Sequence, residues 1–149
     1  MTLYFDTSFL APPILEEAIS RMVERFMARL PPGKLTISQW TRVEFSSLLA
    51  REVRIGGLDR RAARDADAQF ETIIAESFAI LPLDDADCEL AKRFIQRYET
   101  GLRRGDALHL AVAANHRAEA IYTLDRALLK AGRTLGLPMA TGIRLGARI

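Results

Sequence analysis

Short apolar segments alternate with amphipathic segments along this sequence, and this alternation constrains the fold more than any other feature. The apolar segments that we expect to be strands are 3–5, 35–38, 78–81, 120–124 and 138–141. Helical segments between strands are typical of a parallel sheet whose two faces are both covered by helices. We therefore predict an α/β fold, a single-domain α/β/α sandwich around a central, mostly parallel sheet of four to five strands.

The helices are predicted from apolar residues that recur at spacings of three and four. Pro12 and Pro13 suit the first turn of a helix that should run to about Leu30. Further helices are expected at 41–55, 60–76, 85–98, 106–117 and 126–133. No internal repeat or low-complexity linker divides the chain, so residues 1–149 are expected to form one domain.

Composition excludes several classes of protein. A single cysteine, Cys88, rules out an intramolecular disulfide and a cysteine-rich zinc site, which favours a reducing compartment and a cytoplasmic protein; we expect the residue to pack in the core. We find no signal peptide and no apolar run long enough for a membrane span. With 21 basic and 19 acidic residues, the net charge of +2 does not by itself predict a nucleic-acid partner.

Four acidic residues directly follow predicted strands or lie in the first turn of predicted helices. They are Asp6, Glu44, Asp106 and Asp125. Right-handed crossovers bring the carboxyl ends of parallel strands to one edge of the sheet, and ligands bind there. All four carboxylates are therefore expected in one cleft, although long stretches of sequence separate them.

A cluster of four carboxylates requires a compensating positive charge. Mg²⁺ suits such a cluster because it prefers oxygen ligands and is held by a few carboxylates together with water and phosphate oxygens. This chemistry favours hydrolysis of phosphodiester bonds. Ser8 and Thr123 each lie two residues from one of the acids, so their hydroxyls are candidates for positioning water or a phosphate oxygen.

Each acid also has a purely structural interpretation. Helix capping suits three of them: Asp6, Asp106 and Asp125. Glu44 is more informative, because its neighbours Val43, Leu48 and Leu49 favour burial and a carboxylate there needs a partner. A second acidic group, Asp84, Asp85 and Asp87, is expected only to cap a solvated helix.

Four sequence motifs together resemble those of a known family. "YFDTSFL", "RVEF", "GDALHLAVA" and "YTLDRAL", in this order, resemble the four acidic motifs of PIN-domain ribonucleases. The resemblance covers nearly the whole chain, whose length is similar to that of the toxin half of a VapBC toxin–antitoxin pair. It implies that residues 1–149 form a single PIN-like nuclease domain.

The resemblance also implies roles for particular residues. Asp6, Glu44, Asp106 and Asp125 would match the catalytic quartet that binds Mg²⁺ or Mn²⁺, with Ser8 and Thr123 as supporting hydroxyls. Proteins of this family act as endoribonucleases on tRNA, rRNA or mRNA, form homodimers and are silenced by a VapB-type antitoxin. The alternative is a non-catalytic PIN-like module that binds RNA or a protein; loss of an acid would mark it, and all four are present.

Several other residues have two interpretations. Arg103, Arg104 and Arg126 flank two of the acids, and either bind RNA phosphates or are solvated loop charges. His109, three residues after Asp106, is either a core residue or a proton donor near the site. Trp40 either stacks on a base or packs in a core or dimer interface.

Other hydrolase and signalling classes lack their motifs in this sequence. An aspartate-nucleophile phosphatase requires a second acid two residues after Asp6, where this chain has Ser8. No phosphate-binding loop or dinucleotide-binding glycine motif follows the first strand. A receiver domain requires an adjacent pair of acids near the N-terminus, and Asp6 has no acidic neighbour.

Overall fold

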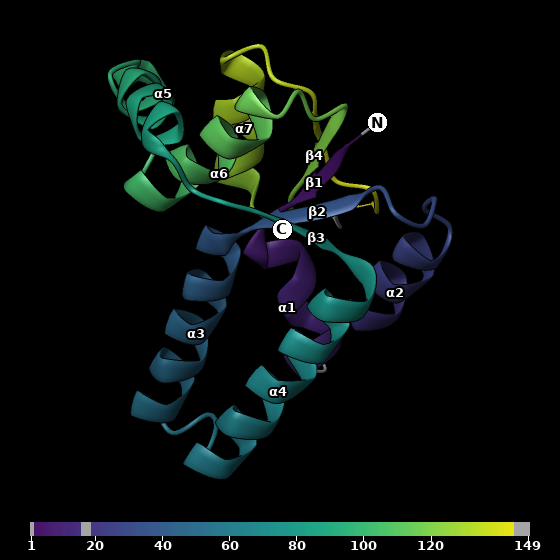
Figure 1. Cartoon of the computed structure of the whole chain (residues 1–149). Coiled ribbons are helices and arrows are strands. Elements are labelled where there is room, and N and C mark those ends of the chain that lie inside the picture. Colours follow the sequence, from purple (N-terminus) through teal and green to yellow (C-terminus); the bar gives the residue numbers. More distant parts are fainter. Residues whose placement is uncertain (1, 16–18, 145–149) are drawn as a thin grey trace.

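A computed structural model describes residues 2–15 and 19–144 of the chain, in which helices lie on both faces of a central sheet (Figure 1). The elements follow in the order β1 (Leu3–Phe5), α1 (Thr7–Leu15), α2 (Ser20–Ala28), β2 (Leu35–Ser38), α3 (Gln39–Arg54), α4 (Arg60–Ser77), β3 (Ala79–Leu81), α5 (Asp85–Ile95), the 3₁₀ turn η1 (Tyr98–Thr100), α6 (Arg104–Asn115), β4 (Ala120–Tyr122), α7 (Arg126–Thr134) and β5 (Met139–Ala140). Within these residues, no helix combines the length and the apolar character needed to cross a bilayer.

The strands of the described residues form one five-stranded sheet in the order β3-β2-β1-β4-β5. Every neighbouring pair is parallel, and Leu3 of β1 lies between Leu35 of β2 and Ala120 of β4. The predicted α/β class is therefore confirmed. Because β1 is the central strand, the residue that follows it lies in the middle of the sheet's carboxyl edge, with the ends of β2 and β4 on either side.

Side chains of β1 enter two different cores. Leu3 and Phe5 pack with residues of α1 to α4, whereas Tyr4 packs against α6 and α7. Figure 1 shows α1 to α4 on one side of the sheet and α5 to α7 on the other. This alternation is the normal result of a strand that is covered on both faces.

The predicted helix from Pro12 to Leu30 is wrong in its bounds. Instead, α1 begins at Thr7 and contains both prolines, and α2 is a separate helix; residues 16–18 between them lie outside the described residues. Asp6 Oδ1 accepts the N–H of Phe9 at 3.3 Å, so a side-chain cap begins α1 earlier than the prolines indicate. Prolines have no N–H to donate to the preceding turn, so Pro12 and Pro13 each remove one backbone hydrogen bond from α1.

The other predicted elements are present, with shifted ends. Helix α3 begins at Gln39 rather than Thr41, because the Thr41 hydroxyl accepts the N–H of Ser38 at 3.2 Å and stabilises an earlier first turn. Glu44 therefore lies in the second turn of α3 and not in the first. Helix α6 begins at Arg104, two residues before its predicted start at Asp106.

Candidate metal and catalytic site

A cleft beside the carboxyl edge of the sheet contains three of the four predicted acids. Glu44 from α3, Asp106 from the first turn of α6 and Asp125 at the start of α7 line this cleft, which has a volume of about 700 Å³. Helix α3 follows β2 directly, and α7 follows β4 after three residues. The parallel sheet thus brings together side chains that are far apart in the sequence.

The fourth acid, Asp6, lies in the buried centre of the sheet edge and is only 4% exposed. Its Oδ1 accepts the hydroxyl of Ser8 at 2.7 Å, and its Oδ2 accepts the hydroxyl of Thr123 at 2.7 Å. The two hydroxyl oxygens are 3.2 Å apart, and Thr123 is fully buried. The two predicted supporting hydroxyls therefore bind the Asp6 carboxylate itself.

Glu44 has the partner that its apolar surroundings require. Its Oε1 accepts the hydroxyl of Thr7 at 2.7 Å and lies 2.5 Å from Nε2 of His109. The other ring nitrogen of His109, Nδ1, is 2.7 Å from the hydroxyl of Tyr4, which is 2.9 Å from that of Ser38. His109 is 1% exposed, so of its two interpretations the structure supports the core residue, one that is hydrogen-bonded to a site carboxylate.

The hydrogen-bonded chain Ser38–Tyr4–His109–Glu44 contains polar residues that the sequence analysis did not single out. Tyr4 lies in an apolar strand, where its ring predicts burial and nothing indicates a partner for its hydroxyl. The sequence does indicate which face of the sheet Tyr4 occupies, because successive side chains of a strand point to opposite faces. Tyr4 therefore points away from Leu3 and Phe5, toward the face that α6 covers.

The carboxylates of the site act on one another. Burial raises the pKa of Asp106 to about 6, and the charges of Asp125, Glu44 and Asp6 add to this effect, while His109 opposes it. Burial also raises the pKa of Asp6. Burial alone would also raise the pKa of Glu44. The hydrogen bond from His109 and the charge of that ring have a larger effect, so the pKa of Glu44 is lowered. The four acids thus form one electrostatic group.

His109 is the buried base of this group. Burial of the ring lowers its pKa, but Tyr4, the hydrogen bond to Glu44 and the negative charges of Glu44 and Asp6 outweigh burial and raise the pKa of His109 to about 10. A protonated ring donates from both nitrogens, and the oxygens of Glu44 and Tyr4 can accept both bonds. The site therefore contains its own compensating charge beneath the carboxylates.

The carboxylates offer the oxygen ligands that hard divalent cations prefer, but they do not form a closed metal site. Among residues 2–15 and 19–144, no group of three or more histidine, cysteine or acidic side chains is placed to hold a metal ion. Asp125 caps α7, with its Oδ1 accepting N–H groups of Ala127 and Leu128 at 2.9 and 3.1 Å, while these bonds leave its Oδ2 for another ligand. A cation at this cleft would therefore need water or ligand oxygens to complete its coordination.

Gly105 allows α6 to approach α3 at this cleft. A Cβ atom at position 105 would lie 2.9 Å from Oε2 of Glu44 and 3.3 Å from Nε1 of Trp40. Trp40 also lines the cleft, and in the described part of the chain its buried Nε1 has no hydrogen-bond partner. The lack of a side chain at Gly105 thus helps to bring Glu44 close to Asp106.

The three predicted arginines are not placed alike. Arg103 and Arg104 are exposed and line the cleft beside Asp106. Arg126 is the first residue of α7 and is exposed, but it is not among the residues that line the cleft. Arg103 and Arg104 can therefore contact a molecule that binds in the cleft beside the carboxylates.

Other sequence expectations require correction. Asp84 and Asp87 cap α5 reciprocally as predicted, but Asp87 is fully buried, and its Oδ1 also accepts an N–H of Asn115 Nδ2 in α6 at 2.8 Å. It therefore joins two helices rather than facing solvent. Cys88, which we expected to pack in the core, is exposed.

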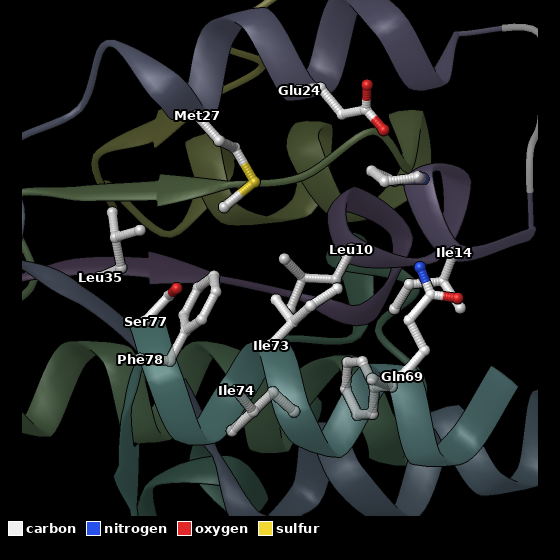
Figure 2. A pocket seen from close by; sticks show the side chains of 12 residues that line it. Leu10, Ile14, Glu24, Met27, Leu35, Gln69, Ile73, Ile74, Ser77 and Phe78 are labelled. Carbon is white, nitrogen blue, oxygen red and sulfur yellow. The ribbon is translucent and has the colours of Figure 1, made fainter. Parts of the chain in front are cut away.

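A separate pocket of about 310 Å³ lies between α1, α2 and α4 (Figure 2). Side chains that include Leu10, Ile14, Met27, Ile73 and Phe78 give it a mainly apolar lining, with Glu24 as the one acidic residue among the lining residues. It shares no lining residue with the carboxylate cleft. This pocket fits an apolar ligand rather than hydrolytic chemistry.

Residues 3–133 match the sequence profile of the PIN domain. The chain belongs to the PIN-domain family. The match confirms the resemblance that the four acidic motifs indicate. A comparison with curated protein sequences finds no match to this PIN domain.

Solved structures share the fold of this PIN domain. The toxin VapC20 of Mycobacterium tuberculosis, described as cleaving the sarcin-ricin loop, is 24% identical with a TM-score of 0.70, over 88% of this chain and 95% of that one. FitAcB from Neisseria gonorrhoeae is 18% identical with a TM-score of 0.74, over 95% and 98% of the two chains. VapBC-1 from nontypeable Haemophilus influenzae is 14% identical with a TM-score of 0.69, over 95% and 98%.

Proposed function

We propose that this PIN domain is a metal-dependent endoribonuclease and the toxin of a type II toxin–antitoxin pair. The observation that carries the proposal is the group of four carboxylates at one sheet edge, in which the pKa of Asp106 is raised to about 6 by burial and by the other three. Groups with pKa values shifted in this way concentrate at functional sites. Structures of VapC and VapBC proteins with the same fold support the same class.

The proposed roles follow from the contacts of each side chain. All four acids would hold Mg²⁺ or Mn²⁺: Glu44, Asp106 and Asp125 from the cleft and Asp6 from the buried sheet edge. When bound, such an ion supplies a Lewis acid that polarises the scissile phosphate and lowers the pKa of water. Ser8 and Thr123 fix the orientation of Asp6, and Thr7 and His109 keep Glu44 ionised and in place.

The residues around the carboxylates would bind the substrate. Arg103 and Arg104 offer positive charge to RNA phosphates at the cleft, where Arg side chains can bind a phosphate through two hydrogen bonds. Arg126, which follows Asp125 at the start of α7, is the third proposed phosphate contact. The substrate class that we propose is tRNA, rRNA or mRNA, and the sarcin-ricin loop in the description of VapC20 is one such RNA.

The proposed partner is a VapB-type antitoxin, with the protein acting in the cytoplasm as a homodimer. Complexes named VapBC, from Haemophilus influenzae and Salmonella typhimurium, share this fold and support the antitoxin. The apolar pocket between α1, α2 and α4 is consistent with a protein partner, because it offers a concave surface for apolar side chains away from the cleft (Figure 2).

The first test is cleavage of total RNA by the purified protein with Mg²⁺, with Mn²⁺ and with EDTA. We expect metal-dependent cleavage that is lost in the variants Asp6→Asn and Asp106→Asn. The variant Asp85→Asn is the matched control, because Asp85 is an exposed acid in the first turn of α5. Circular dichroism shows whether each variant keeps its fold.

The outcomes separate the two functions under consideration. Cleavage that both site variants lose and the control retains would support the nuclease. Intact RNA under every condition, with a folded wild-type protein free of antitoxin, would instead favour the non-catalytic module that binds RNA or protein.

A further inference from the structure

The cleft that contains the carboxylates has a second, apolar wall. Trp40 and Val43 of α3, Ile95 at the end of α5 and Leu102 before α6 form this apolar wall. Val43 keeps 55% of its surface exposed and Trp40 is half-buried, so both still present surface to a ligand. A cation and its waters make no use of such a surface, because apolar groups offer them neither charge nor hydrogen bonds.

The lining of the cleft offers a binding group for each part of a nucleotide. Glu44, Asp106 and Asp125 suit a cation bound to a phosphate, and Arg103 and Arg104 suit the phosphate charge. In RNA the phosphate and the ribose are polar, and the faces of the bases are the apolar surfaces that remain. Aromatic side chains bind single-stranded nucleic acids by stacking on these faces.

Resting on the proposed function, we propose that the apolar wall is a subsite for one unpaired nucleobase next to the phosphodiester bond that faces the carboxylates. Trp40 supplies its aromatic surface, and Val43 and Leu102 are its aliphatic neighbours. A base within a duplex is stacked on both faces and is not available to this wall. The subsite therefore selects single-stranded segments such as loops and bulges.

Gly105 contributes to the subsite through its lack of a side chain. A Cβ atom at this position would be 3.3 Å from both Cζ2 and Nε1 of Trp40, closer than ordinary van der Waals contact. The indole therefore lies against the backbone of α6, next to Asp106. This contact fixes the aromatic surface relative to a carboxylate of the site.

Trp40 reports on the subsite directly because it is the single tryptophan of the chain. The experiment titrates wild-type protein in EDTA, so that the RNA stays intact, with a short single-stranded RNA while the tryptophan fluorescence is recorded. The comparison ligands are the same RNA with abasic nucleotides and the RNA annealed to its complement. We expect the single strand to quench Trp40 fluorescence, and the abasic and duplex ligands to bind about five-fold more weakly or worse.

Variants measured with a fluorescently labelled RNA localise the effect. We expect Trp40→Ala and Val43→Ser to weaken binding of the intact single strand, and Trp40→Phe to retain most of it. Ile55→Ser is the matched control, because Ile55 is an exposed aliphatic residue directly after the same helix and does not line the cleft. Far-ultraviolet circular dichroism verifies that each variant is folded.

Failure of the subsite differs from failure of the nuclease. Equal binding of intact and abasic RNA would overturn the subsite, even if the protein cleaves RNA in a metal-dependent way. Base-dependent quenching without cleavage in any metal would support the subsite and reject the nuclease. Quenching by an apolar antitoxin peptide, with no response to RNA, would also overturn the subsite, because a protein side chain would then be its occupant.

Discussion

The side chain of His109 joins two layers of the molecule, because it contacts Tyr4 in the central strand and Glu44 in the cleft. We expect His109→Leu to remove one hydrogen bond from Glu44 Oε1 and one from the Tyr4 hydroxyl, and to lower the free energy of unfolding by about 2–4 kcal/mol. Metal affinity should fall about ten-fold or more, as for other residues that orient a metal ligand. Urea unfolding and a Mn²⁺ titration measure the two effects.

Tyr4→Phe is the control for His109→Leu. It removes one hydroxyl from the same chain of hydrogen bonds but leaves the contact between His109 and Glu44. We expect a loss of about 1 kcal/mol and nearly unchanged metal affinity. If both variants lost metal affinity equally, the role of His109 would be general packing and not the positioning of Glu44.

The raised pKa of Asp106 predicts a pH-dependent stability in metal-free buffer. Folding raises the pKa from 3.8 to about 6, so the folded state binds more protons between these values, and stability falls as pH rises through this window. Asp106→Asn removes the titration and should be more stable than wild type above pH 6. Because the side chain is partly solvated, we expect a gain of about 1 kcal/mol, or about 2–4 °C in Tm.

Melting curves of both proteins in EDTA between pH 4 and pH 8 test this prediction. The two Tm values should approach each other as pH falls from 6 toward 4, because the wild-type carboxyl is then protonated in the folded state and the unfolded state, with a pKa of 3.8, begins to bind the proton as well. A difference in Tm that stays constant over the whole range would show that Asp106 carries no unfavourable charge in the folded protein.

The positions of the acids could be predicted from the sequence, but their contacts could not. Asp6 and Asp125 follow apolar segments, and this local pattern is enough to place them beyond the ends of strands. The contact between Tyr4 and His109 spans 105 residues and depends on how α6 packs on the sheet. Burial of Asp87 likewise depends on Asn115 in another helix, which no nearby residue indicates.

At the scale of elements, the close approach of α3 and α6 depends on Gly105. Alanine normally stabilises a helix relative to glycine by about 0.5–1 kcal/mol. In Gly105→Ala, however, the added methyl group would lie 2.9 Å from Oε2 of Glu44 and must displace that carboxylate or the helix. We expect stability to change little and RNA cleavage to fall by about ten-fold or more, because small misplacements of catalytic groups are costly.

A single preparation of Gly105→Ala serves for both measurements, with urea unfolding for stability and initial cleavage rates for activity. A glycine elsewhere provides the contrast, since a Cβ at Gly33 would meet no atom within 4 Å, although its φ of +79° favours glycine. Gly33→Ala should therefore lower stability and leave the cleavage rate per folded molecule unchanged. Full activity of Gly105→Ala would show that the close contact between Gly105 and Glu44 is not needed for cleavage.

Helix bounds show where local sequence signals compete. Pro12 and Pro13 indicate a helix start, but the Asp6 cap, six residues earlier, begins α1. Both signals are local, and their relative strength depends on the buried hydroxyls that hold Asp6. The segments that form α3 and α4 each contain only one candidate start and one candidate end. Their predicted and observed bounds differ by at most two residues.

For the whole molecule, a bound cation should stabilise the folded state, because the carboxylates meet only in that state. A ligand at a hundred-fold excess over its Kd adds about 2.7 kcal/mol. We therefore expect Mn²⁺ to raise the Tm of wild type by several degrees at pH 7.5, and to leave the Tm of Asp106→Asn nearly unchanged. Equal shifts in both proteins would indicate that the ion binds outside this cleft.

The hairpin of α3 and α4 ends in an exposed turn at Gly56 and Gly57, far along α3 from the sheet (Figure 1). A chain cut at this turn would carry Asp6 and Glu44 on one fragment and Asp106 and Asp125 on the other. Neither fragment alone would hold all four acids, because strands β2 and β1 of the first fragment must insert between β3 and β4 of the second before the acids can meet. If the chain is the ribonuclease that we propose, RNA cleavage would then report whether two proteins fused to the halves come together in a cell.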